Sequence, residues 1–174
     1  MENKVEIKSI SNANVYVEGG SLLGKCEKVK LPDVSFATDE VKPLGLVGAF
    51  EVPTGLEKME GEIVWISYYP GAAPLYANPW KTHKIQIRSS SDTHDDNGLL
   101  SRQPMVTHMN CAFKKSAMGE YEQNKGARFT SSFSCTYIKQ VLDGKDMLEI
   151  DVLNNIYRVE GEDMLAEYRE NIGG

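Results

Sequence analysis

One stretch of the sequence decides the fold class: Phe129-Thr130-Ser131-Ser132-Phe133-Ser134-Cys135-Thr136-Tyr137. In an extended chain, successive side chains point to opposite faces, so the odd-numbered residues share one face and the even-numbered residues share the other. The odd face carries the aromatic rings, whereas the even face carries only small hydroxyl groups. The pattern predicts a β-strand with one buried face and one small, polar, uncharged face.

Further strands extend this prediction along the chain. Asp143-Gly144 is a strong signal for a two-residue hairpin turn, and Leu148, Ile150 and Val152 alternate along the return strand. We expect these two strands to pair antiparallel. Other strands are expected over residues 13–17, 24–31, 60–67, 82–88, 105–113 and 156–159. Seven or eight strands in all predict a mainly β protein, built as a β-sandwich or barrel.

Helical signals are few. The segment 162–172 predicts a C-terminal α-helix, because Met164, Leu165 and Tyr168 recur at helical spacing and a glycine follows. A short mid-chain helix is expected over residues 72–76, where neighbouring prolines limit it to a turn or two.

Two long connections stand out within a single expected domain, residues 1–174. Residues 33–55 mix apolar side chains with prolines and glycines, which indicates an extended arm or loose hairpin whose apolar side needs a cover. Residues 89–103 are rich in serine and aspartate, which predicts a mobile polar loop.

The composition describes a globular, acidic protein. Apolar residues make up 41% and charged residues 25% of the 174 residues, as in ordinary soluble domains. With 19 basic and 25 acidic residues the formal charge is −6, the wrong sign for a protein that grips phosphates. The longest mostly apolar stretch, 44–50, falls far short of the about 18 residues of a membrane-spanning helix. The start shows no secretion signal, so we expect no membrane-spanning segment and assembly in a cytoplasm.

A glycine-rich stretch imitates a nucleotide-binding loop. Gly19-Gly20-Ser21-Leu22-Leu23-Gly24-Lys25-Cys26 matches G-x-x-x-x-G-K-[ST] at every position but the last. That position needs a hydroxyl for magnesium, and a helix must follow to present its amides to the phosphates. Cys26 replaces the hydroxyl and a strand-like pattern follows, so we interpret the stretch as a hairpin turn. A small nucleotide-binding enzyme that uses Gly19 to Cys26 is the remote alternative.

No other pattern indicates catalysis or a metal. Segment 91–98 combines carboxylates with a histidine, but its spacing does not fit a calcium loop. The remaining histidines lie outside any H-E-x-x-H arrangement. Cys26, Cys111 and Cys135 form no C-x-x-C pair, and we interpret them as small apolar residues. The sequence predicts no enzyme, no cofactor and no metal site.

The C-terminal segment carries a more specific signature. Residues 148–169 read as a strand, an Asn154-Asn155 turn, the pattern R-x-x-G-x-D-x-L-A from Arg158, and a helix. This segment resembles the end of the major tail tube protein of contractile-tailed bacteriophages. The upstream order agrees, with a strand at 14–19, Val29-Lys30-Leu31-Pro32 followed by an arm, and a second strand after residues 55–60. Residues 68–127 are longer and more polar than the family pattern.

The resemblance implies a structural protein. In this family six copies form a ring, each subunit lends strands to one continuous inner β-barrel, and rings stack into a tube beneath a contractile sheath. The implied partners are further copies of the chain and the tail sheath, baseplate, tail terminator and tape measure proteins. DNA would pass through without specific binding, and the implied location is the virion tail. A tube protein of an R-type bacteriocin or a type VI-like injection particle is the alternative.

A lumen face can be nominated because acids and small hydroxyls leave passing DNA unneutralised, so that no counterions are released and the DNA slides. The candidate lumen face consists of Thr130, Ser132, Ser134 and Thr136, with Glu60 and Glu62 as second choice. The alternative is that these residues face the outer solvent.

Two further surfaces are expected to make contacts. The candidate inter-ring arm carries Phe36, Val41, Leu44, Leu46, Val47 and Phe50. Alternatively, this arm folds back over its own sheet. The helix residues Met164, Leu165 and Tyr168 are expected to pack on the outer side of the barrel, with partner binding as the alternative.

Overall fold

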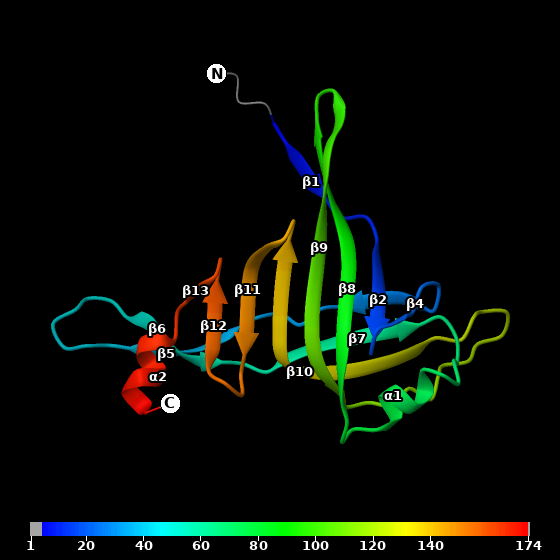
Figure 1. Ribbon diagram of the computed structural model, residues 1–174. Helices are drawn as coiled ribbons and strands as arrows, with labels where there is room; N and C mark the ends of the chain where they lie inside the picture. The colour runs from blue at the N-terminus through cyan, green and yellow to red at the C-terminus, as the bar shows by residue number, and fades with distance from the viewer. Residues whose placement is uncertain (1–4, 174) are drawn as a thin grey trace.

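A computed structural model describes residues 5–173 (Figure 1). The predicted mainly β class with two short helices is confirmed. The strands are β1 (Ile7–Ser9), β2 (Ala13–Val17), β3 (Gly20–Ser21), β4 (Cys26–Lys30), β5 (Phe36–Val41), β6 (Phe50–Leu56), β7 (Met59–Trp65), β8 (Thr82–Asp95), β9 (Gly98–Phe113), β10 (Phe129–Leu142), β11 (Lys145–Asp151), β12 (Ile156–Val159) and β13 (Glu162–Asp163). The helices are α1 (Ala73–Ala77) and α2 (Ala166–Ile172).

Strand β10 belongs to two layers. Its first part, Phe129 to Cys135, pairs with β7, which in turn pairs with β4; we call these strands the small layer. Its second part pairs with β11 and β9 in the large layer, where the order is β13-β12-β11-β10-β9-β8-β2-β3. Figure 1 shows β10 turning from the direction of β7 into the direction of β9. The two layers are therefore halves of one folded sheet.

A β-bulge makes this corner. Cys135 pairs with Cys111 and Tyr137 pairs with Asn110, so Thr136 is the extra residue. Bulges bend a strand, and strands that switch between packed sheets use them at the corner. The bulge also shifts the alternation by one, so that Ile138 is 2% exposed and Tyr137 is only half-buried. The expectation that Tyr137 shares the buried face of Phe129 is therefore wrong.

The core lies between the two layers. Phe113 packs edge-on against Phe133 with ring centroids 5.9 Å apart, and Trp65 donates a hydrogen bond to the buried Ser131 hydroxyl at 3.1 Å. A Cβ at Gly61 would lie 2.5 Å from the Lys30 carbonyl oxygen and 2.6 Å from the Phe133 ring. Position 61 therefore needs glycine, because backbone and ring approach it too closely for a side chain.

Two of the two-residue hairpin turns follow directly from their residues. Asp143 and Gly144 have φ of 49° and 76°, which is the geometry that a tight hairpin turn requires. Glu18 and Gly19 have φ of 49° and 80° and connect β2 to β3. The glycine-rich stretch is thus a hairpin turn followed by a strand, as interpreted from the sequence.

The predicted polar loop over 89–103 is wrong. These residues form the ends of β8 and β9, a hairpin that turns at Asp96-Asn97 and is joined by β1 through Ile7 opposite His94. Backbone pairing with neighbouring strands holds this segment extended, although its serines and aspartates favour turns when taken alone. We call β1 and residues 90–103 the finger, which projects beyond the other strands in Figure 1.

The C-terminal helix is shorter than predicted. Residues 162–163 form β13 opposite Val159 and Arg158, and α2 begins only at Ala166. The Asp163 carboxylate accepts the Leu165 N–H at 3.0 Å and holds the Arg169 guanidinium at 2.7 Å, which fixes the turn before the helix. Within residues 5–173 no helix meets the length and hydropathy that a membrane span requires.

Candidate functional site

The two candidate lumen sets lie on one surface. Ser134 is directly opposite Glu60, and Ser132 is directly opposite Glu62, on the outer face of the small layer. Thr130 continues this row opposite Val64, whereas Thr136 sits at the bulge where the row ends. We call Thr130, Ser132, Ser134, Glu60 and Glu62 the hydroxyl–glutamate face.

Lysines neutralise this face, and the sequence reasoning did not include them. The Lys114 ammonium lies 2.6 Å from the Glu60 carboxylate, and its hydrogen bond holds the pKa of Glu60 below its ordinary value. Lys28 lies 3.8 Å from Glu62, and Lys30, on the same strand, lies 3.6 Å from Asp33. The alternation Lys28-Val29-Lys30 was the available signal, because an inward-facing valine between two lysines puts both lysines on the outer face. The face is therefore balanced in charge rather than acidic.

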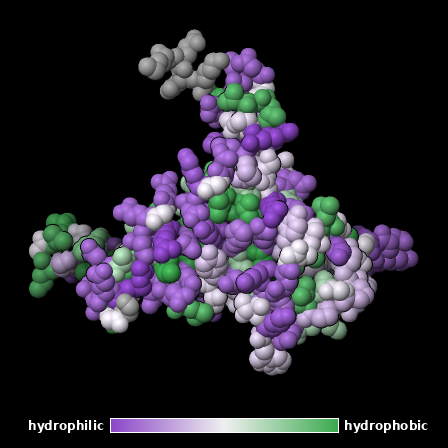
Figure 2. All heavy atoms as spheres, in the orientation of Figure 1, coloured by the Kyte–Doolittle hydropathy of each residue, from purple (hydrophilic) through white to green (hydrophobic). Residues whose placement is uncertain are grey.

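The arm is a two-stranded hairpin, β5 with β6, and its apolar residues fall into three groups. At the base, Phe36 packs edge-on against Tyr157 with centroids 5.5 Å apart. In the middle, Val41 lies directly opposite Phe50. At the tip, Leu44, Leu46 and Val47 project into solvent, with relative exposures of 104%, 61% and 110%. Figure 2 shows this tip as an apolar patch at one extreme of the molecule.

An apolar groove of about 630 Å³ lies at the base of the arm. The helix-packing candidates line it together with residues of β6 and β12: its walls include Phe36, Leu56, Tyr157, Met164, Leu165 and Tyr168. Helix α2 has no buried residue, and Met164 and Tyr168 are each about half exposed. The expected core packing is therefore incomplete in the single chain, because these side chains remain partly exposed to solvent.

The finger is a surface that sequence reasoning missed. Ile7 and Leu99 flank His94 in one cross-strand row, and both are exposed, as is Leu100. Strand β10 pairs with β9 as far as Met105, and the Asp143 N–H donates to the Pro104 carbonyl at 2.8 Å. Among the described residues, the backbone of β9 over 98–103 therefore pairs with β8 alone. Figure 2 shows apolar residues near the finger tip. The only signal in the sequence was the pair Leu99-Leu100 beside a polar turn.

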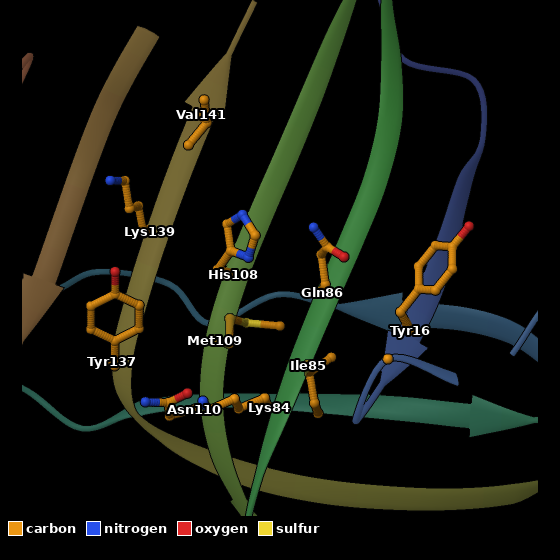
Figure 3. Close-up of a pocket in the computed structure, with 11 residues that line it drawn as sticks. Tyr16, Lys84, Ile85, Gln86, His108, Met109, Asn110, Tyr137, Lys139 and Val141 are labelled. Atoms are coloured by element: carbon orange, nitrogen blue, oxygen red, sulfur yellow. The ribbon is translucent and has the colours of Figure 1, made fainter. Parts of the chain in front are cut away.

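The outer face of the large layer carries a polar hollow of about 570 Å³ (Figure 3). Its polar walls come from four neighbouring strands: Tyr16, Lys84, Gln86, His108, Asn110, Tyr137 and Lys139. Burial and a 3.0 Å hydrogen bond donated to Glu149 raise the pKa of Tyr137 to about 12. Lys139 pairs with Asp146 at 2.8 Å. The hollow is shallow, and its walls contain lysines and a histidine but no carboxylate.

Nothing in the described part of the chain assembles a catalytic or metal site of the kinds considered from the sequence. No group of three or more His, Cys, Asp or Glu side chains within residues 5–173 could hold a metal ion. Lys25 lies over the Tyr69 ring, with its ammonium 5.9 Å from the centroid, and β4 rather than a helix begins at Cys26. The stretch from Gly19 to Cys26 therefore lacks the geometry of a phosphate loop.

Comparison with known proteins identifies the family. The family described as phage tail tube protein FII matches residues 7–173. The chain belongs to the phage tail tube family. It is 30% identical to the tail tube protein of Escherichia phage P2 over 164 residues, which cover 92% of this chain and 94% of the relative. It is 25% identical to the major tail tube protein of Serratia phage KSP20 over 162 residues, 92% of each chain.

Solved structures of contractile injection systems share the tail tube fold. The sheath/tube terminator of the PVC extracellular contractile injection system gives a TM-score of 0.54 at 17% identity, covering 75% of this chain and 93% of the other. The PVC sheath–tube complex gives 0.54 at 17% identity, covering 75% and 88%. The predicted family and structural role are confirmed, and a tail tube protein belongs to the virion tail and is not an enzyme.

Proposed function

We propose that this tail tube protein assembles into rings of six copies that stack into the conduit for genome delivery. The observation that carries the proposal is the pair of unlike margins of the large layer. One margin ends in β3 and the other in β13, each only two residues long, so β2 and β12 are covered over part of their length. Unlike margins pair head-to-tail between copies, and such a contact closes a ring when its rotation divides a full turn. The number six comes from the family resemblance.

The hydroxyl–glutamate face is our candidate for the channel wall. Its lysines and carboxylates balance, since Lys28, Lys30 and Lys114 face Glu62, Asp33 and Glu60. A wall without excess positive charge releases few counterions from DNA, so the genome slides instead of adhering. The polar hollow on the large layer has the opposite chemistry, with Lys84 and His108 beside Lys139. We place that hollow against protein neighbours.

The two projections fit two different neighbours. Figure 1 shows the arm and the finger leaving the molecule in different directions. The arm tip exposes Leu44, Leu46 and Val47, and Phe36 anchors the base of the arm on Tyr157. We assign the arm to the contact between stacked rings and the finger to a separate contact between copies, because each presents apolar side chains that the single chain does not cover.

The remaining partners of the proposal are the sheath, the baseplate, the tail terminator and the tape measure protein, met during assembly in the host cytoplasm. Fold likeness to the tube of a sheath–tube complex supports the sheath. The relatives in phages P2 and KSP20 favour a phage tail over a bacteriocin or secretion particle.

Negative-stain microscopy and analytical ultracentrifugation of the purified protein test the proposal. With rising concentration we expect closed rings of six with an axial hole, followed by tubes. A protein that sediments as a monomer at every concentration would contradict it.

Cysteine labelling of assembled tubes tests the channel wall separately. In a Cys26→Ser background, Ser132→Cys should react with a small maleimide in tubes, and with a maleimide wider than the channel only in monomers. Glu122→Cys, in the exposed loop between β9 and β10, is the matched control and should react with both reagents in both states. If the wide reagent labels Ser132→Cys in intact tubes, the face lies outside the channel although the ring proposal stands.

A further inference from the structure

Two of the three cysteines meet at the corner between the layers. Cys111 on β9 and Cys135 on β10 are direct partners in the antiparallel register. Directly opposite residues have Cα atoms about 4.5–5.5 Å apart, which lies within the about 4.4–6.8 Å that a disulfide spans. Their Sγ atoms are 2.7 Å apart. The backbone spacing and the directions of the two side chains therefore allow a disulfide bond.

Both thiols are buried, and each is the thiol that the other can reach. Cys111 is 0% and Cys135 is 6% exposed. Met109 and Met59 also neighbour Cys135, the Met109 sulfur at 4.0 Å, but thioethers cannot form a disulfide. Cys26 lies on β4 opposite Trp65, outside the pair. The bulge residue Thr136 follows Cys135 directly, so the backbone can adjust locally as the sulfurs approach.

We propose that Cys111 and Cys135 form a dithiol site that closes to an intrachain disulfide when the assembled protein meets an oxidant. A small peroxide is the class of oxidant that fits so buried a site. One thiolate attacks a peroxide oxygen, giving a sulfenic acid and hydroxide, and the second thiol displaces water to form the S–S bond. Two thiols and one hydrogen peroxide thus give one disulfide and two waters.

The cellular compartment determines when the disulfide would form. Cytoplasmic thiol systems keep such pairs reduced, whereas particles outside the cell meet oxidising conditions. This timing rests on the proposed function, but the geometry of the pair does not. The bond would tie β9 to β10 where β10 changes layers, and it would close the loop from 111 to 135. A closed loop restricts the unfolded chain, so the oxidised tube is expected to resist unfolding better than the newly assembled one.

The rate of closure is expected to depend on pH. The hydrogen bond with Cys135 and burial raise the pKa of the Cys111 thiol. The titratable group opposite Cys111 on β10 is Cys135, and the one opposite it on β8 is the buried His83, whose Nδ1 lies 3.3 Å from the Glu18 carboxylate. Since only the thiolate attacks, closure is expected to be slow at pH 7 and to accelerate as pH rises.

The test treats the full chain, purified under reducing conditions, with hydrogen peroxide. Thiols are counted after denaturation, and the intact mass and disulfide-linked peptides are measured. We expect the count to fall from three to one, a mass loss of about 2 Da as two hydrogens leave, a linked peptide joining 111 to 135, and a melting temperature raised by several degrees until a reductant is added.

Cys26→Ser is the matched control and should still lose two thiols, whereas Cys111→Ser and Cys135→Ser should form no intrachain link. The proposal is overturned if all three thiols survive, or if Cys26 oxidises while the pair stays reduced. Microscopy of the Cys111→Ser/Cys135→Ser variant keeps the two proposals apart, because rings should still form without the pair.

Discussion

The corner between the layers and the two projections use the same kinds of residues in opposite ways. At the corner, Phe133 and Phe113 are almost completely buried, and the Phe133 ring lies so close to Gly61 that a side chain at position 61 would clash with it. On the arm tip, Leu44 and Val47 are fully exposed. Apolar side chains that a single chain leaves in water mark surfaces for other molecules. The corner is therefore buried within the single chain, whereas the arm tip is not, and we propose that other copies cover it.

Strand number explains the difference physically. The corner gathers β7, β9 and β10, and packed side chains from both layers exclude water there. The arm is a separate two-stranded sheet. An isolated hairpin is at best marginally stable in water, and the Phe36–Tyr157 contact packs the base of the arm against β12.

The largest expected loss of stability comes from a substitution that leaves a cavity at the corner. Phe133→Ala removes a ring packed on Phe113 and leaves a cavity, and we expect it to lower the free energy of unfolding by about 3–5 kcal/mol. Urea denaturation followed by Trp65 fluorescence measures this loss. Val47→Ala on the arm tip should change the same quantity by about 0.5 kcal/mol or less. Equal losses at both positions would remove the distinction between the two regions.

Substitutions at two adjacent residues of β10, one on each face, should differ in their effect on stability. Ser131→Ala leaves the buried Trp65 N–H without its acceptor, which is expected to cost about 1–3 kcal/mol of stability. Ser132→Ala, on the hydroxyl–glutamate face, should lie within about 0.5 kcal/mol of the wild type. Denaturation curves of the two variants provide the comparison. A larger loss of unfolding free energy in Ser132→Ala than in Ser131→Ala would contradict the assignment of residue 131 to the core.

The turn before α2 should respond to acid. The Arg169 guanidinium, together with the Leu165 N–H, holds the pKa of Asp163 below its ordinary value. A carboxyl group whose pKa is lowered by folding stabilises the folded state at pH values above its ordinary pKa. This stabilisation is lost as the pH falls through the lowered pKa. The difference in melting temperature between the wild type and Asp163→Asn should be present at pH 7 and shrink in acid. A difference that stays constant down to pH 2 would contradict this account, and Asp39→Asn on the exposed arm is the control.

Substitutions at the arm tip should have the smallest effect on stability and the largest effect on assembly. Replacing Leu44, Leu46 and Val47 together by serine should leave the melting temperature of the single subunit nearly unchanged, because these side chains already lie in water. Tubes, in contrast, should fail to elongate in negative-stain images. Met118→Ser, a similarly exposed apolar residue in the loop between β9 and β10, is the control and should leave tubes intact. Normal tubes in the triple variant would remove the arm from the ring contact.

Local pattern determined much of this protein by itself. The alternation from Phe129, the Asp143-Gly144 turn and the apolar residues of 33–55 predicted strands, a hairpin and an uncovered surface, because each depends on residues close in sequence. The hydroxyl row and the two glutamates were also nominated from sequence, but nothing local showed that they face one another across β7 and β10.

Tertiary structure alone decided the rest. The extra residue at Thr136, the meeting of Cys111 with Cys135, and the lysines beside Glu60 and Glu62 depend on the register between strands far apart in the chain. The finger formed from polar residues that favour turns, because pairing with β1 and between β8 and β9 outweighed their local preference. Strand register and the corner of a folded sheet are collective properties, so they emerge only when the distant segments have been brought together.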